Sequence, residues 1–296
     1  MLAAITMTVS AAENVTIYYS WTAADVAANF HRSIADEANK IQTKYNFIFD
    51  VKPGAGGSIA ANHILNTAPE TGILANSSAF FIRPNFFPVT ESHDIGKFKE
   101  LLPVCSAPIV ISSKKYKTWA EVPKDKPLTV GMSGMGTTTH LVSTQIAKNY
   151  PLMTIVPFKS TSEALMATLS DSTDFAINFF GDSAQYQSGK NRVYVLGSTG
   201  DKTINGVLPL AKQGFAKDLA LMNSPAQLLV PASIPDETFN AWRKILVQAA
   251  RSERVQNTYK PDSCVSIDQM PDSEIQKFYQ TQTDNWKRLT NGVSLK

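Results

Sequence analysis

Two glycine-rich segments are the best candidates for binding a ligand. They are Gly54-Ala55-Gly56-Gly57-Ser58 and Gly134-Met135-Gly136-Thr137-Thr138-Thr139, and each stands between a strand-like run and a helical one. Glycine lets the backbone approach a ligand closely, and the free N–H groups at a helix start offer donors and partial positive charge to an anion. A carboxylate or phosphate is therefore the natural guest, although a tight turn with positive φ explains either segment taken alone.

Neither segment carries a nucleotide-binding or hydrolytic signature. The third glycine of the dinucleotide pattern is replaced by Ile59 and by Thr139, and no Gly-Lys-Ser/Thr follows. Ser133 is not in a nucleophile elbow because Met135 stands where that motif needs glycine. His140 lies in the first helical turn, where an imidazolium is disfavoured and a packing role is favoured. We therefore predict no catalytic residue.

Length and composition describe a globular chain, and its 296 residues suit two domains of about 100 to 200 residues each. Apolar residues make up 43% and charged residues 18%, which is typical of a mixed α/β protein. The 28 basic and 25 acidic residues are scattered, which argues against a nucleic-acid partner. Cys105 and Cys264 provide neither a disulfide framework nor a zinc cluster, so we expect no metal and no cofactor. Whether they pair is open, and two buried thiols are the favoured interpretation.

The first twelve residues, MLAAITMTVSAA, form a short apolar run that closes on small residues before the polar Glu13-Asn14. This pattern favours the remnant of an export signal, and we predict that residues 1–12 are one. A basic start is missing, so an apolar lead-in to a strand is the alternative. No later stretch reaches the ~18 uninterrupted apolar residues of a spanning helix, and a soluble protein is expected.

On either side of the glycine segments, short apolar runs alternate with amphipathic ones along the chain. This rhythm predicts an α/β fold of mostly parallel sheets flanked by helices. Ligands of such sheets collect at the carboxyl ends of strands, where Trp21 and the segment 179–183 follow predicted strands. The predicted strands cover residues 15–19, 47–51, 101–104, 109–112, 128–130, 153–158, 175–179, 193–196 and 227–230.

Five segments in order resemble one known family, the periplasmic solute-binding proteins of tripartite tricarboxylate transporters, often called the Bug family. Residues 51–61, VKPGAGGSIAA, resemble its P-G-A-G-G-x-I-G segment, and residues 68–74 resemble its A-x-P-D-G-Y-T-L. Residues 134–141 resemble its second ligand loop, and residues 156–160 its V-P-Y-K-G. Residues 224–235 resemble the returning segment L-x-x-P-A-x-x-P. The order and spacing of these weak motifs carry more weight than any one of them.

The resemblance implies a two-domain Venus-flytrap receptor with no enzymatic activity. It implies domain I over residues 13–105 and 230–296, and domain II over residues 106–229. Such a periplasmic receptor closes on a small carboxylate, pins it by backbone N–H groups and waters, and hands it to membrane permease subunits. We expect it to act as a monomer.

Carried over position by position, the resemblance also implies a set of ligand-binding residues. Two departures stand out, since Trp21-Thr22 replaces the usual Gly-Gly pair and narrows the mouth, and Asn29 stands about where the family often has arginine. The implied residues are Ser20, Trp21, Thr22, Ala24 and Asp25 in the first loop, Gly134, Gly136, Thr137 and Thr138 in the second, and Lys159, Ser160 and Asp182 at strand ends of domain II.

Two other functions remain open from the sequence. One is a ligand sensor that presents its closed form to a membrane signalling partner. The other is a small hydrolase or transferase that uses Ser133 or His140 in the same cleft.

Overall fold

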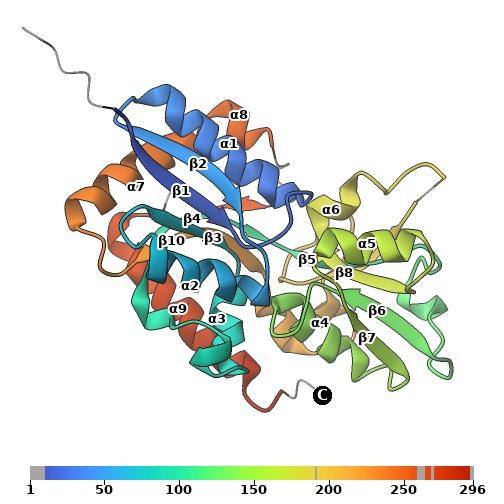
Figure 1. Ribbon diagram of the computed structural model, residues 1–296. Coiled ribbons are helices and arrows are strands. Elements are labelled where there is room, and N and C mark those ends of the chain that lie inside the picture. The colour runs from blue at the N-terminus through green and yellow to red at the C-terminus, as the bar shows by residue number, and fades with distance from the viewer. Residues whose placement is uncertain (1–10, 191, 259–263, 268–269, 294–296) are drawn as a thin grey trace, which may run out of the picture.

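The computed structural model describes residues 11–190, 192–258, 264–267 and 270–293. The chain forms two lobes side by side, one built from its beginning and end and the other from its middle (Figure 1). The predicted signal remnant, residues 1–12, lies almost entirely outside the described residues. Among the helices that are described, none is both long and apolar enough to cross a membrane.

The first lobe contains a six-stranded sheet in the order β11-β4-β10-β3-β1-β2. Strand β1 is next to the edge strand β2, and it pairs in parallel with β2 and β3 so that Ile17 lies opposite both Phe49 and Ile73. Strand β10 runs antiparallel between β3 and β4. The strands are β1 (Glu13–Tyr19), β2 (Tyr45–Val51), β3 (Gly72–Asn76), β4 (Phe98–Ala107), β10 (Ser224–Pro231) and β11 (Val265–Ser266).

Helices cover both faces of this sheet (Figure 1). One face carries α1 (Val26–Ile41), α7 (Asp236–Ala250) and α8 (Glu253–Gln256), and the other carries α2 (Ser58–Thr67), α3 (Ala79–Ile82) and α9 (Asp272–Thr290). Helix α1 forms because its apolar residues recur at helical spacing, and Phe30, Ile34 and Ala38 are buried against the sheet. On the same face Trp242 of α7 packs edge-on against Tyr45.

The second lobe contains a five-stranded sheet in the order β7-β6-β8-β5-β9. Strand β6 is parallel to β7 and β8, whereas β5 is antiparallel to β8 and β9. The elements are β5 (Ile109–Ser113), β6 (Leu128–Met132), β7 (Met153–Pro157), β8 (Phe175–Phe179), β9 (Tyr194–Ser198), α4 (Thr138–Ala147), α5 (Thr161–Leu169) and α6 (Phe180–Ala184). Short 3₁₀ turns lie at Ala55–Gly57, Arg83–Asn85, Val89–Glu91, Ile95–Lys97, Trp119–Glu121, Leu210–Lys212 and Lys217–Leu221.

The expected α/β architecture of two lobes is confirmed, but both sheets are mixed. The strands that cross between the lobes are the antiparallel ones. Strand β4 continues through Pro108 into β5 without a crossover helix, and β4 is antiparallel to β10 in the first sheet while β5 is antiparallel to β8 in the second. The chain returns to the first sheet at Ser224, where β10 begins. The sheets therefore change at residues 107–109 and 222–224, compared with the predicted changes after residues 105 and 229.

Helix α9 touches both lobes at its carboxyl end. Trp286 and Leu289 belong to the same apolar core as Leu219 and Met222 of the second lobe. Arg288 Nη1 lies 3.5 Å from Asp218 Oδ1. The two lobes are thus connected by a packed helix as well as by the two strand crossings.

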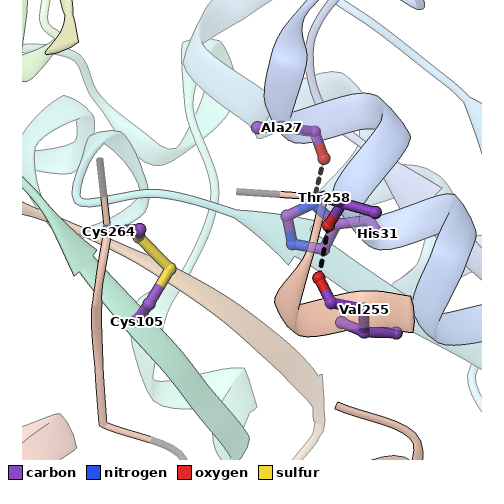
Figure 2. Close-up of a disulfide and its surroundings, with 6 residues drawn as sticks. All are labelled: Ala27, His31, Cys105, Val255, Thr258 and Cys264. Carbon is purple, nitrogen blue, oxygen red and sulfur yellow. Dashed lines mark hydrogen bonds between the residues drawn. A yellow bond between two sulfur atoms is a disulfide. The ribbon is translucent and has the colours of Figure 1, made fainter. Parts of the chain in front are cut away.

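Cys105 and Cys264 form a disulfide, so the interpretation of two buried thiols is wrong (Figure 2). The pairing follows from β11, which runs antiparallel to β4 and places Ser266 opposite Cys105. This register brings the two Cα atoms to 5.4 Å, within the range that a disulfide spans.

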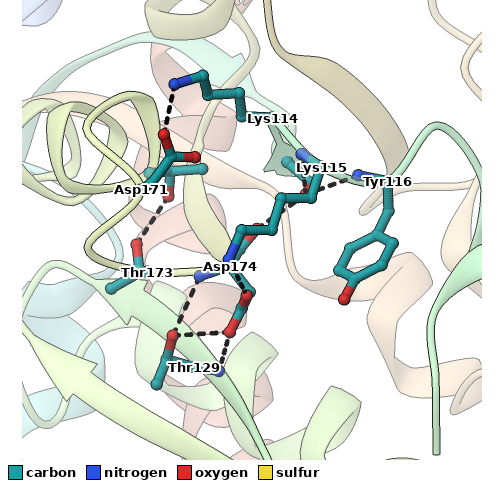
Figure 3. Close-up of polar contacts among 9 residues, drawn as sticks. Lys114, Lys115, Tyr116, Thr129, Asp171, Thr173 and Asp174 are labelled. Atoms are coloured by element: carbon teal, nitrogen blue, oxygen red, sulfur yellow. Dashed lines mark hydrogen bonds and ion pairs between the residues drawn. The ribbon is translucent and has the colours of Figure 1, made fainter.

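The turn between α5 and β8 is tied to neighbouring strands by polar contacts (Figure 3). Lys114 Nζ lies 2.6 Å from Asp171 Oδ2, and Lys115 Nζ lies 2.7 Å from Asp174 Oδ1. Asp174 also accepts hydrogen bonds from the backbone N–H and the hydroxyl of Thr129 in β6. Burial raises the pKa of Asp174, but the contacts with Lys115 and Thr129 outweigh it and leave that pKa below its ordinary value. These contacts hold the turn at the carboxyl end of α5 in place against the sheet.

Candidate functional site

A small cavity of about 30 Å³ lies between the lobes. Its walls come from the end of β1, the start of α1 and the loop after β3 in the first lobe, and from the starts of α4 and α5 and the end of β8 in the second. This is the place at which ligands of open α/β sheets gather. The lining residues are Tyr19, Trp21, Asp25, Ala27, Ser77, Ser133, Thr137, Thr138, Thr139, Thr161, Phe179 and Asp182.

Asp25 is the charged residue that the first lobe contributes. It precedes α1 as the N-cap residue, and its side chain is 5% exposed. Asp25 Oδ1 accepts a hydrogen bond of 3.1 Å from the Thr22 hydroxyl, and Oδ2 accepts one of 3.4 Å from the Tyr19 hydroxyl. Burial raises the pKa of Asp25, and hydrogen bonds from Ser162 and Thr22 oppose that rise. The carboxyl group is therefore buried in a setting of neutral donors.

The second lobe contributes the start of α4. Thr137 caps the helix, since its hydroxyl accepts from the His140 N–H at 3.3 Å and donates to the Gly134 carbonyl at 2.9 Å. Gly136 has φ of 71°, and a Cβ there would lie 3.0 Å from the Phe87 ring, so the loop requires glycine. The first N–H groups of a helix have no partner within it, so the amide of Thr138 can serve a ligand in the cavity.

Hydrogen bonds join the lobes across the cleft. Ser162 at the start of α5 donates to Asp25 Oδ1 at 3.0 Å. The Ser78 hydroxyl bonds to Thr138 of α4, and it lies 2.8 Å from the hydroxyl of Ser224, where the chain re-enters the first sheet. The small cavity and these bridges describe lobes that are closed upon each other.

Asp182 is the second acid in the cavity wall. It lies in the first turn of α6, is 4% exposed and accepts a hydrogen bond of 3.3 Å from the Phe179 N–H. Burial raises the pKa of Asp182 to about 7, and the charge of Asp25 adds to the rise. Burial also raises the pKa of Tyr19, with further contributions from both acids. The two carboxyl groups thus act on each other electrostatically.

A second cavity of about 90 Å³ adjoins the first and shares Tyr19, Trp21 and Asp182 with it. Its other walls are largely apolar and include Phe30, Ala226 and the disulfide. His31 lines this cavity beside the disulfide (Figure 2). Burial lowers the pKa of His31 to about 4, so its imidazole is neutral near pH 7.

Five of the residues implied by the resemblance meet in the first cavity, namely Trp21, Asp25, Thr137, Thr138 and Asp182. The others form the supports behind the wall or lie at the surface. Ser20 donates to the Ala75 carbonyl, Ser160 caps α5, and the Lys159 side chain is exposed. The implied residues that do not line it are Ser20, Thr22, Ala24, Gly134, Gly136, Lys159 and Ser160.

The residues that sequence reasoning missed lie beside those that it named. Ser77 follows a strand end, Thr139 follows Thr138, and Thr161 follows Ser160, so the strand-end rule could have found all three. Tyr19 and Phe179 are the last residues of β1 and β8. Aromatic side chains at those positions resemble ordinary core residues in a sequence.

The first glycine segment, residues 54–58, supports the fold rather than the cavity wall. Gly57 has φ of 95°, and a Cβ on it would lie 2.0 Å from Nδ2 of Asn76 at the end of β3. None of the five residues lines either cavity. The tight-turn interpretation therefore accounts for this segment.

The geometry does not pair Ser133 with His140. The Ser133 hydroxyl lies 2.9 Å from the Thr139 hydroxyl, and the His140 ring faces Phe86 with centroids 6.4 Å apart. His140 is absent from the wall of the cavity that Ser133 lines. Within the described ranges, no three His, Cys, Asp or Glu residues are grouped so as to hold a metal ion.

Comparison with known proteins gives one family match and one curated relative. The model of the tripartite tricarboxylate transporter family receptor matches residues 30–295. The UPF0065 protein in the gbd 5' region of Cupriavidus necator is 31% identical over 149 residues, which cover 47% of this chain. The chain spans less than half, 45%, of that relative's length.

Solved structures share the fold at low sequence identity. The periplasmic binding protein BugD superposes with a TM-score of 0.83 at 17% identity, covering 94% of this chain and 96% of that one. A protein of R. palustris solved with adipate gives 0.80 at 16% identity, with 94% and 96% covered. MatC of Rhodopseudomonas palustris with bound malate gives 0.75 at 15% identity, with 94% and 99% covered.

Proposed function

Because the chain belongs to the tripartite tricarboxylate transporter receptor family, we propose that it is a periplasmic receptor for a small carboxylate. In this proposal the two lobes close on the ligand, and the closed form delivers it to the membrane permease subunits of such a transporter. The protein performs no chemistry on its ligand.

One observation carries the proposal, which is the cavity whose wall is shared by both lobes. Asp25, which lines the cavity from the first lobe, accepts a hydrogen bond from Ser162 of the second lobe. A wall divided in this way is complete only when the lobes are closed, so a ligand held there favours closure. Binding and closure are therefore one event, which is what a receptor that reports occupancy to a permease requires.

The start of α4 is the part of the wall that suits a carboxylate. The backbone amides of Thr138 and Thr139 are the donors at the positive end of this helix, since the Thr137 hydroxyl donates to the Gly134 carbonyl and the Thr138 hydroxyl is bonded to Ser78. Hydrogen bonds to a charged group contribute about 1.5 to 3 kcal/mol each, so two or three of them account for tight binding without a basic side chain. The adipate and malate in two structural neighbours support a carboxylate as the guest.

Ligand-induced thermal stabilisation tests this proposal. A carboxylate at a hundred times its Kd should stabilise the folded protein by about 2.7 kcal/mol. Thr138→Leu places a larger apolar side chain in the cavity and should abolish the shift, whereas Thr144→Leu, on the same helix but outside the cavity wall, should keep it. An equal shift in both variants would remove the start of α4 from the site.

Delivery needs a separate experiment. Deleting the gene should abolish cellular uptake of the carboxylate that stabilises the protein, and re-expression should restore uptake. The carboxylate should also be recovered chemically unchanged after incubation with the purified protein. Uptake that persists without the protein would contradict its role in transport.

A further inference from the structure

The cavity between the lobes is acidic. Asp25 and Asp182 both line it, and both side chains are more than nine-tenths buried. Among the described residues that line the two adjoining cavities there is no lysine or arginine. A ligand that brought only negative charge would therefore enter beside two buried acids with no side-chain cation to balance them.

Of the two acids, Asp182 keeps the greater hydrogen-bond capacity for a ligand. An ionised carboxyl group offers about four lone-pair positions. Asp25 receives hydrogen bonds from Thr22, Ser162 and Tyr19, with Ser160 as a further donor, so its capacity is nearly filled. The Asp182 carboxyl accepts from the Phe179 N–H and from the Thr161 hydroxyl, which leaves about two positions for a ligand. Helix starts at α1 and α6 offset part of the negative charge, but a helix end carries only about half an elementary charge.

His31 adds an unused acceptor in the adjoining cavity. Its Nδ1 lies 2.7 Å from the Ala27 carbonyl, which accepts, so Nδ1 carries the proton and Nε2 is a bare acceptor. His31 is 1% exposed, and its Nε2 has no hydrogen-bond partner among the described residues. A buried acceptor without a partner is costly unless a ligand supplies the donor.

From these acceptors we infer that the ligand carries a protonated amine as well as a carboxylate, and that Asp25 and Asp182 receive the amine. This inference deepens the proposed function and rests on it. An ammonium group supplies three N–H donors and one positive charge, which two carboxyl groups and a neutral imidazole can accept. The ligand is then a zwitterion of the amino-acid class.

The residues that line the two cavities indicate where the rest of such a ligand lies. Its carboxylate lies at the start of α4, its ammonium lies between Asp25 and Asp182, and its side chain extends into the cavity walled by Trp21 and Phe30. That cavity measures about 90 Å³. Because a cavity of about 150 Å³ admits benzene, this space suits a short aliphatic side chain better than an aromatic one.

Matched probes separate this inference from the proposed function. Calorimetric titration would compare the twenty amino acids with the des-amino acids 3-methylbutanoate and 4-methylpentanoate, with the amine 3-methylbutylamine and with malate and adipate. We expect short aliphatic amino acids to bind about tenfold or more tightly than their des-amino counterparts, the loss expected for one charge-assisted hydrogen bond.

The other possible results of the titration contradict either the amine inference or the proposed carboxylate receptor. Equal or tighter binding of des-amino acids or dicarboxylates overturns the amine inference and leaves the proposed carboxylate receptor standing. Equal binding of the amine alone overturns the carboxylate part of the proposed function. Binding of none of the probes overturns both. Mass spectrometry of ligand retained by freshly purified protein gives an independent answer, because an amino acid contains nitrogen and a simple carboxylate does not.

Removing the charge of Asp182 tests whether this residue binds the amine of the ligand. Asp182→Asn keeps the size and the carbonyl acceptor of the side chain but removes its charge. It should weaken the amino acid by about tenfold or more and leave the des-amino acid no weaker, since only the amine loses its partner. The exposed Asp125→Asn controls for the loss of one negative charge and should change neither affinity. Equal weakening of both probes by Asp182→Asn would overturn the assignment.

Discussion

The buried acid Asp182 makes the ligand-free protein less stable as pH rises, and Asp182→Asn should remove that loss. Its pKa is raised from 3.8 to about 7, chiefly by burial and then by the charge of Asp25. Between about pH 4 and pH 7 the unfolded chain has therefore lost a proton that the folded protein still holds. Stability contributed by this group is present at the acid end of that window and is lost as pH rises through it.

The size of the effect follows from the same pKa. Each tenfold difference in proton affinity is worth about 1.4 kcal/mol, so the interval from 3.8 to about 7 sets a ceiling of about 4 kcal/mol. Asp182→Asn cannot ionise, and its amide oxygen can still accept from the Phe179 N–H. The variant should have nearly the stability of the wild type at pH 4.5 and exceed it by about 2 to 4 kcal/mol at pH 8.

Urea unfolding at pH 4.5, 5.5, 6.5 and 8 measures this difference, because the midpoint and slope give the free energy of unfolding at each pH. Subtracting the wild-type curve cancels the contributions of other titrating groups. Asp125→Asn, which removes a surface charge, should run parallel to the wild type. A difference between Asp182→Asn and the wild type that stays constant from pH 4.5 to 8 would refute the reasoning, and so would one that shrinks.

Three further predictions concern the scaffold. Cys105→Ser with Cys264→Ser opens a link across 159 residues and should lower the free energy of unfolding by about 2 to 5 kcal/mol, measured by urea unfolding with reductant as the wild-type comparison. Gly57→Ala should cost about 2 kcal/mol or more in the same assay, because its φ is positive and its Cβ would meet Asn76; a change below 0.5 kcal/mol would contradict that contact. Glu100 is fully buried, and burial raises its pKa well above 4.5, so its stability contribution is lost as pH rises above that value. Glu100→Met should therefore add about 1 kcal/mol or more at pH 8 and less at pH 4.5, and a loss at pH 8 would show that the acid is needed.

Periodicity in the sequence predicts much of the scaffold. Strand β1 alternates, with Val15, Ile17 and Tyr19 buried, and α1 repeats apolar residues at helical spacing. Both patterns are local, so the sequence reveals them directly. The antiparallel half of each sheet depends on which strands cross between lobes. That is a property of distant segments, and short runs such as β5 and β10 do not encode it on their own.

The site is predictable at the level of backbone position and less so at the level of side chains. The strand-end rule leads to the loops that hold Trp21, Thr138 and Asp182 in the cavity wall. The same rule names Lys159, whose side chain is exposed, because the end of a strand fixes where the backbone lies but not where a side chain points. The sequence does not reveal the disulfide because the two cysteines are 159 positions apart. They meet only because the two-residue strand β11 pairs with β4.

Helix α9 determines how the lobes can separate. Its last turns share an apolar core with Leu219 and Met222, while its first turns lie on the sheet of the opposite lobe. A motion that opens the lobes to admit a ligand must therefore either rotate about helix α9 or slide this helix over the residues on which it packs. Arg288 and Asp218 line neither cavity, so substitutions there would alter the rate of ligand release without changing the residues that contact the ligand.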